Sequence, residues 1–96
     1  MPTKTSDVFT NKYYVYVLQS QKDLKLYIGF TNDLKRRLQD HNLGKVDSTK
    51  TRRPLKLIHY EYFQNRQDAE AREIYLKSGY GHNQLKQILK NTLKMS

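Results

Sequence analysis

The chain has 96 residues and no cysteine, so we expect one domain without disulfides or a cysteine-ligated zinc site. Its 18 Lys and Arg against 9 Asp and Glu give a formal net charge of +9, typical of a nucleic-acid-binding domain, although lysines that merely confer solubility are the plainer alternative. No apolar stretch approaches the roughly 20 residues of a membrane-spanning helix, and residues 1–11 lack a signal-peptide apolar run. We therefore expect a cytoplasmic protein without a membrane partner, with a flexible N-terminal lead-in over residues 1–11 and a single domain over residues 12–93.

Two strands open the predicted domain. Tyr13–Leu18 is a continuous aromatic and β-branched run, too short for a helix, and suits a strand covered on both faces. A polar loop over Ser20–Lys25 separates it from a second strand, Leu26–Phe30, which we expect to pair antiparallel with the first. Gly29 interrupts the second strand, and glycine inside a strand weakens packing and often marks a bulge or a close approach by a ligand.

A helix is predicted next, running to Leu43 and ended by Gly44 in the left-handed conformation. Thr31 or Asn32 is expected to cap its start, with Asp33 in the first turn.

This helix carries two stripes of interest. Leu34 and Leu38 are four residues apart and should face the sheet. Arg37 and His41 have the same spacing on a line beside them, so we expect both at the seam between helix and sheet.

A basic segment follows. Gly44–Pro54 has no periodicity and is predicted to be an exposed loop. Basic residues crowd this region against a single Asp47, and arginine pairs suit phosphate binding. The candidate nucleic-acid-binding residues are Lys45, Lys50, Arg52, Arg53 and Lys56.

The rest of the chain predicts one more strand and two helices. Leu55–Phe63 is rich in strand formers. Asn65 can cap a helix that continues to Lys77, and Asn83 can cap a last helix after a turn over residues 80–82. The last helix should turn Leu85, Ile88, Leu89 and Leu93 inward. The order β-β-α-β-α-α predicts an α+β fold with a three-stranded antiparallel sheet flanked by helices.

Glu73 is anomalous in this scheme because it lies between Ala69 and Leu76 on the expected inner face of its helix. A buried charge needs a partner. Lys77, four residues later, could supply an ion pair, which is the plainer explanation.

The chain resembles the GIY-YIG endonuclease superfamily, especially its small stand-alone bacterial members, from about Tyr13 to Leu89. The first motif stands as Tyr14-Val15-Tyr16, which departs from the family's glycine and isoleucine, and the second is unaltered as Tyr27-Ile28-Gly29. The family's arginine, histidine and glutamate fall on Arg37, His41 and Glu73. The order and spacing of all these residues make the match specific.

The resemblance implies a catalytic role for each residue. Tyr16 would activate the attacking water with help from His41, Tyr27 would position water or phosphate, and Arg37 would stabilise transition-state charge. Glu73 would hold one divalent cation, Mg²⁺ or Mn²⁺. Lys77 and Asn83 are auxiliary candidates. The plainer alternatives are core tyrosines, a solvated arginine and a histidine favoured by a helix C-terminus.

The resulting hypothesis is a metal-dependent endonuclease that hydrolyses DNA phosphodiester bonds, on branched or damaged DNA in repair or recombination. DNA is expected as the partner rather than RNA, with the basic loop clamping the backbone. The alternative is a non-catalytic basic DNA- or RNA-binding or accessory module with the same fold.

Overall fold

The protein, described here by a computed structural model over residues 11–95, is an α+β domain built on one three-stranded antiparallel sheet. The strands are β1 (Tyr13–Ser20), β2 (Leu26–Thr31) and β3 (Leu55–Phe63), arranged in the order β2-β1-β3. The predicted fold class and the antiparallel pairing of the first two strands are therefore confirmed. The predicted lead-in lies, apart from Asn11, outside the described residues.

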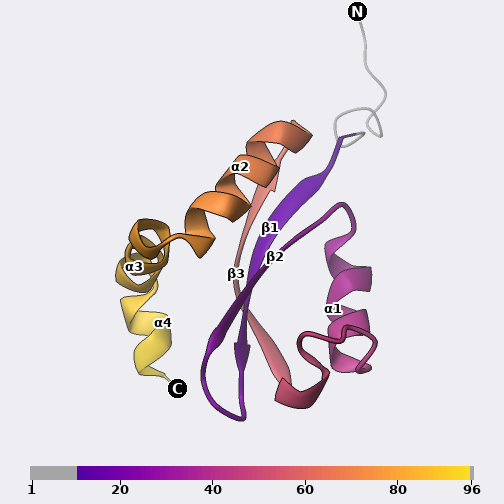
Figure 1. Ribbon diagram of the computed structural model, residues 1–96, viewed down its shortest axis with the longest axis vertical. Helices are drawn as coiled ribbons and strands as arrows, with labels where there is room; N and C mark the ends of the chain where they lie inside the picture. The colour runs from indigo at the N-terminus through magenta and orange to yellow at the C-terminus, as the bar shows by residue number, and fades with distance from the viewer. Residues whose placement is uncertain (1–10, 96) are drawn as a thin grey trace, which may run out of the picture.

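The helices lie on opposite faces of the sheet (Figure 1). One face is covered by α1 (Leu34–Asn42), and the other by α2 (Arg66–Lys77) and α3 (Gly79–Ile88), with the short α4 (Lys90–Lys94) after them. No helix between residues 11 and 95 is long and apolar enough to cross a membrane.

The side chains of β1 point alternately to the two faces of the sheet. Val15 and Val17 point into the cluster formed with α2 and α3, whereas Tyr16 and Leu18 point into the cluster beneath α1. Because side chains of a strand alternate between faces, one buried strand can contribute residues to the core on each side of the sheet. As predicted from its composition, β1 is covered on both sides.

The start of α1 differs from the prediction. Asp33 is the N-cap, because its carboxylate accepts from the backbone N–H of Arg36 at 3.2 Å. Thr31 ends β2 instead, and its hydroxyl accepts from the Asp33 N–H at 3.1 Å. The predicted end is confirmed, since Gly44 has a φ of +77°.

The C-terminal helices also differ from the prediction. The expected turn over residues 80–82 is helical, and Asn83 is exposed within α3 and not a cap. Ser78 caps α3, accepting from the Gly81 N–H at 3.2 Å. A side chain on Gly81 would overlap the Tyr75 carbonyl, so this glycine permits a close contact and does not form a turn. Ile88, expected inside, is exposed.

The basic segment is more ordered than an exposed loop. It contains a short 3-10 helix, Lys50–Arg52, and Thr49 just before it is fully buried. The Asn42 amide joins the end of α1 to β3, donating to the Leu55 carbonyl at 3.2 Å and accepting from the Leu55 N–H at 3.1 Å. These contacts hold the segment against the sheet.

Candidate active site

The site begins with a close contact between neighbouring strands. Tyr16 of β1 lies opposite Gly29 of β2, and its ring passes directly over that glycine. A Cβ at position 29 would overlap the Cζ and Oη atoms of Tyr16. Glycine is therefore needed here so that the phenol can reach across β2 toward α1.

The Tyr16 hydroxyl lies in a buried chain of hydrogen bonds. Its Oη is 2.8 Å from Nε2 of His41, and Nδ1 of His41 is 2.7 Å from Oγ1 of Thr49. All three side chains are essentially inaccessible to solvent. Arg37 adds a longer contact, with its Nε donating to Tyr16 Oη at 3.4 Å. The helix spacing of Arg37 and His41 thus brings both to one hydroxyl.

Burial determines the protonation states of Tyr16 and His41 in this hydrogen-bonded chain. It is the main reason that the pKa of Tyr16 rises to about 12; Arg37 opposes the rise, and the Tyr27 and Glu73 charges add to it. Burial, aided by the Arg37 charge, lowers the pKa of His41 below its usual value. At neutral pH Tyr16 therefore keeps its proton and His41 is uncharged. The phenol then donates to Nε2, and Nδ1–H donates to Thr49.

Tyr27 completes an aromatic cluster around the imidazole. Its ring centroid lies 5.1 Å from that of His41 at an interplanar angle of 64°, and 6.4 Å from that of Tyr16. The predicted residues Tyr16, Tyr27, Arg37 and His41 therefore lie together. The other motif residues differ in role: Val15 and Ile28 belong to the aliphatic core on the opposite face.

Glu73 approaches from the other side of the sheet, on α2. Its carboxylate accepts from Lys77 Nζ at 3.0 Å, so the ion pair expected from the sequence is confirmed. Its side chain is only 22% exposed, and its charge contributes to the raised pKa of Tyr16. Glu73 thus lies within electrostatic range of the tyrosine while paired with a lysine.

The residues present fit a divalent cation only in a limited way. Within residues 11–95, no three His, Cys, Asp or Glu side chains lie close enough to hold a metal ion. Magnesium sites in enzymes commonly use one or two carboxylates, with water and substrate phosphates completing the shell. Glu73 is a single carboxylate of this kind, and its Lys77 partner is half exposed.

The predicted basic cluster divides into two groups. Lys45, Lys56 and Arg53 are exposed, as is Lys50, which pairs with Asp47 at 3.5 Å. Arg52 instead folds against the β1–β2 hairpin, where its Nε is 3.6 Å from Asp23. Its Nε and Nη2 atoms are buried, and phosphate binding by Arg52 stays a prediction.

Sequence reasoning missed two residues. Thr49 is one, because a polar loop without periodicity has no sequence pattern that predicts which of its side chains will be buried. Arg66 is the other: it begins α2, and its guanidinium lies 5.5 Å over the Phe30 ring. Together with Arg37 it lines a surface groove of about 280 Å³ that also includes Thr31 and Asn32. The predicted cap at Asn65 could have pointed to Arg66, because the cap determines which residue begins α2.

Comparison with known proteins identifies a family and several relatives of this chain. A family described as the GIY-YIG catalytic domain matches residues 12–86. UPF0213 protein YsiG of Lactococcus lactis is 42% identical over 84 residues, covering 86% of this chain and 80% of that protein. A UPF0213 protein of Clostridium perfringens is 39% identical over 82 residues, covering 84% and 87%.

A solved structure is similar as well. The solution NMR structure of a UPF0213 protein from Bacillus halodurans shares 31% identity and a TM-score of 0.52, covering 80% of this chain and 84% of that chain. With most of its length matched by the family, this chain belongs to the GIY-YIG catalytic domain family.

Proposed function

We propose that this protein is a metal-dependent endonuclease that hydrolyses phosphodiester bonds in branched or damaged DNA, in repair or recombination. The observation that carries the proposal is the buried Tyr16 hydroxyl, which bridges a neutral histidine and an arginine. Core packing alone does not require a chain of three buried polar side chains beside an arginine-lined groove.

The pair of Tyr16 and His41 can act as one general base. Water that attacks the phosphorus transfers its proton to Tyr16 Oη while the phenol proton passes to Nε2 of His41. The P–O bond to the departing DNA oxygen breaks as the new one forms, and that oxygen takes a proton from solvent. A free tyrosinate is never formed, which matters because the pKa of Tyr16 is about 12. Thr49 keeps the imidazole in the tautomer that can accept at Nε2.

Arg37 links this base to the substrate. It contacts Tyr16 through a long hydrogen bond and also lines two grooves, one shared with Arg66 and one with Arg36. A phosphate in either groove would attract the Arg37 guanidinium, leaving Tyr16 Oη open to water. The same charge would then stabilise the negative charge that develops on the phosphate.

Glu73 is the residue that would hold the cation. A divalent ion, when bound, supplies a Lewis acid that polarises the phosphate. Lys77 must release the Glu73 carboxylate for this to occur, and its own ammonium would then be free to contact substrate.

The alternative function is a DNA- or RNA-binding module that does not cut. The observation that favours it is the Glu73–Lys77 ion pair, which satisfies the carboxylate without a metal. The formal charge of +9 suits either function.

Cleavage assays on nicked, flapped, four-way and linear DNA, with Mg²⁺ or EDTA, separate these functions. We expect Glu73→Gln to abolish metal-dependent cutting, whereas Glu70→Gln, on the same helix and paired with Arg66 at 3.4 Å, retains it. Arg37→Ala should slow cleavage by about a hundredfold or more, and exposed Arg36→Ala far less. Salt-sensitive binding without cleavage of any substrate would favour the binding module.

A further inference from the structure

A group of tyrosines that the proposed chemistry does not use lies on the same face of the sheet as Tyr16. Tyr14 of β1 pairs with Tyr62 of β3, and Tyr16 pairs with Tyr60. The Tyr14 ring centroid is 6.0 Å from that of Tyr60 and 5.7 Å from that of Tyr62. We call Tyr14, Tyr60 and Tyr62 the tyrosine platform.

The tyrosine platform is not covered by α1. Leu34 and Leu38 of that helix pack on the cluster that contains Tyr16 and Leu18. Tyr60 is 52% exposed and Tyr62 38% exposed, although both lie within a strand. Joined aromatic rings exposed on a sheet often mark a binding surface.

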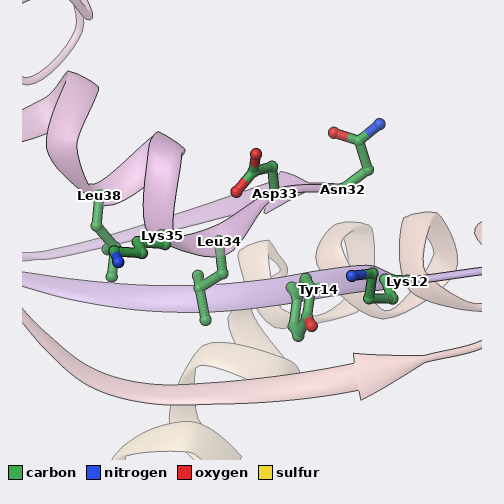
Figure 2. A pocket seen from close by; sticks show the side chains of 7 residues that line it. All are labelled: Lys12, Tyr14, Asn32, Asp33, Leu34, Lys35 and Leu38. Carbon is green, nitrogen blue, oxygen red and sulfur yellow. The ribbon is translucent and has the colours of Figure 1, made fainter. Parts of the chain in front are cut away.

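Positive charge borders the tyrosine platform. Tyr14 also lines a groove of about 470 Å³ between β1 and the start of α1. Figure 2 shows Leu34 next to Tyr14 at this groove, with Lys12 at one end and Lys35 at the other, and Asp33 between them. Both lysines are exposed. An aromatic surface flanked by lysines suits a ligand with flat apolar rings and regularly spaced negative charges.

We propose that the tyrosine platform stacks on unpaired bases of single-stranded DNA adjoining the candidate active site, which rests on the proposed nuclease function. Aromatic side chains on a sheet are a common stacking surface for single strands, and flanking basic residues follow the phosphates. Paired bases are already stacked on one another and do not offer a free face. Tyr14 and Tyr16 are two residues apart on β1, so their Cα atoms are roughly 7 Å apart. A base stacked on Tyr14 would therefore lie next to the residue that carries the reactive hydroxyl. The platform thus selects DNA with a single-stranded arm.

The test measures binding without cleavage. Fluorescence anisotropy in EDTA compares a labelled single strand of about 20 nucleotides with its duplex. We expect Tyr60→Ala to bind the single strand about tenfold more weakly, with little change for the duplex. Tyr60→Phe keeps the ring and should bind like the unchanged protein. Tyr80→Ala is the matched control, since Tyr80 is 86% exposed on α3, away from this face.

Salt dependence separates stacking from charge. Tyr60→Ala removes no charge, so it should weaken binding at every salt concentration and leave the slope of log affinity against log salt unchanged. Lys35→Ala should reduce the steepness of that slope by about 0.7 for a single strand.

Three results would overturn the proposal: no single-strand binding by the unchanged protein, unchanged affinity in Tyr60→Ala, or equal loss for single strand and duplex. None of them depends on cleavage. Failure of the nuclease proposal would appear separately, as cutting that persists in Glu73→Gln or as no metal-dependent cutting at all.

Discussion

The two faces of the sheet have opposite characters although one strand serves both. On the face toward α2 and α3, β1 fully buries two aliphatic side chains, Val15 and Val17, against Leu76 and Leu85, and Tyr13 packs at the margin of this cluster. The face toward α1 buries Tyr16 together with His41 and Thr49 in a hydrogen-bonded chain. Alternation along β1 therefore directs its valine side chains into one interior and the Tyr16 hydroxyl, with its hydrogen-bonded partners, into the other.

This division has an energetic consequence. An aliphatic interior is sensitive to lost volume, because a cavity forfeits packing contacts. A buried polar chain is sensitive to a lost partner, because each unpaired donor or acceptor carries a desolvation penalty. We therefore expect substitutions of the buried aliphatic residues on the α2 face to change stability without changing the site, and substitutions in the polar chain on the α1 face to change both.

The largest expected effect is on the aliphatic face. Leu76→Ala should lower the free energy of unfolding by about 3 kcal/mol, since Leu76 is fully buried between sheet and helices. Urea denaturation measures the loss. Ile74→Ala, on the same helix but 70% exposed, should change it by less than about 0.5 kcal/mol. A similar loss from both variants would contradict the assignment of the α2 face as the main core.

The next effect comes from the contact between strands. Gly29→Ala should destabilise the fold by about 2 kcal/mol, because the added methyl overlaps the Tyr16 ring and must displace it. The displaced phenol would also leave His41, so DNA cleavage should fall more than the folded fraction does. Circular dichroism on heating measures the first, and a cleavage assay on folded protein the second. Gly79→Ala has open space around its Cβ and should be nearly neutral.

Strand patterns and caps made much of this fold predictable. The bounds of β3 and the Asn65 cap of α2 agree with expectation, because each depends on a short stretch of chain. Gly81 misled because glycine has two uses, and the close approach to Tyr75 was read as a turn.

The candidate site was predictable where helix geometry links its residues. A spacing of four on α1 was enough to place Arg37 and His41 on one line, and both reach Tyr16. Thr49 and Arg52 could not be read in this way, because their burial depends on how the loop returns to the sheet. The residues next to Thr49 and Arg52 in the sequence do not predict the course of the loop.

A smaller effect tests the buried polar chain directly. Thr49→Val keeps the shape of the side chain but removes the partner of His41 Nδ1, so it should cost about 1–2 kcal/mol of stability. Cleavage should fall as well, since the imidazole loses the contact that fixes its tautomer. Exposed Thr51→Val is the matched control and should change neither quantity. Equal stability of the two variants would mean that Thr49 contributes packing volume only and that its hydrogen bond to His41 does not stabilise the fold.

The smallest expected effect is a pH dependence that distinguishes the two faces. Because burial lowers the pKa of His41 in the folded state, the unfolded chain binds more protons just below its own histidine pKa of about 6.5. Stability should therefore fall as pH decreases below about 6.5, by at most about 1.4 kcal/mol per pH unit for this one group.

Urea unfolding of the unchanged protein and His41→Gln, at several pH values between about 5 and 7.5, measures this slope. The variant should show a flatter dependence whatever its overall stability, while His59 and His82 are common to both proteins and do not affect the difference. Asp23 and Glu61 have lowered pKa values, so the stability they contribute is lost only at more acidic pH. Parallel slopes would show that His41 is protonated as readily in the folded protein as in the unfolded chain. The α1 face would then not hold the neutral imidazole on which the proposed proton transfer depends.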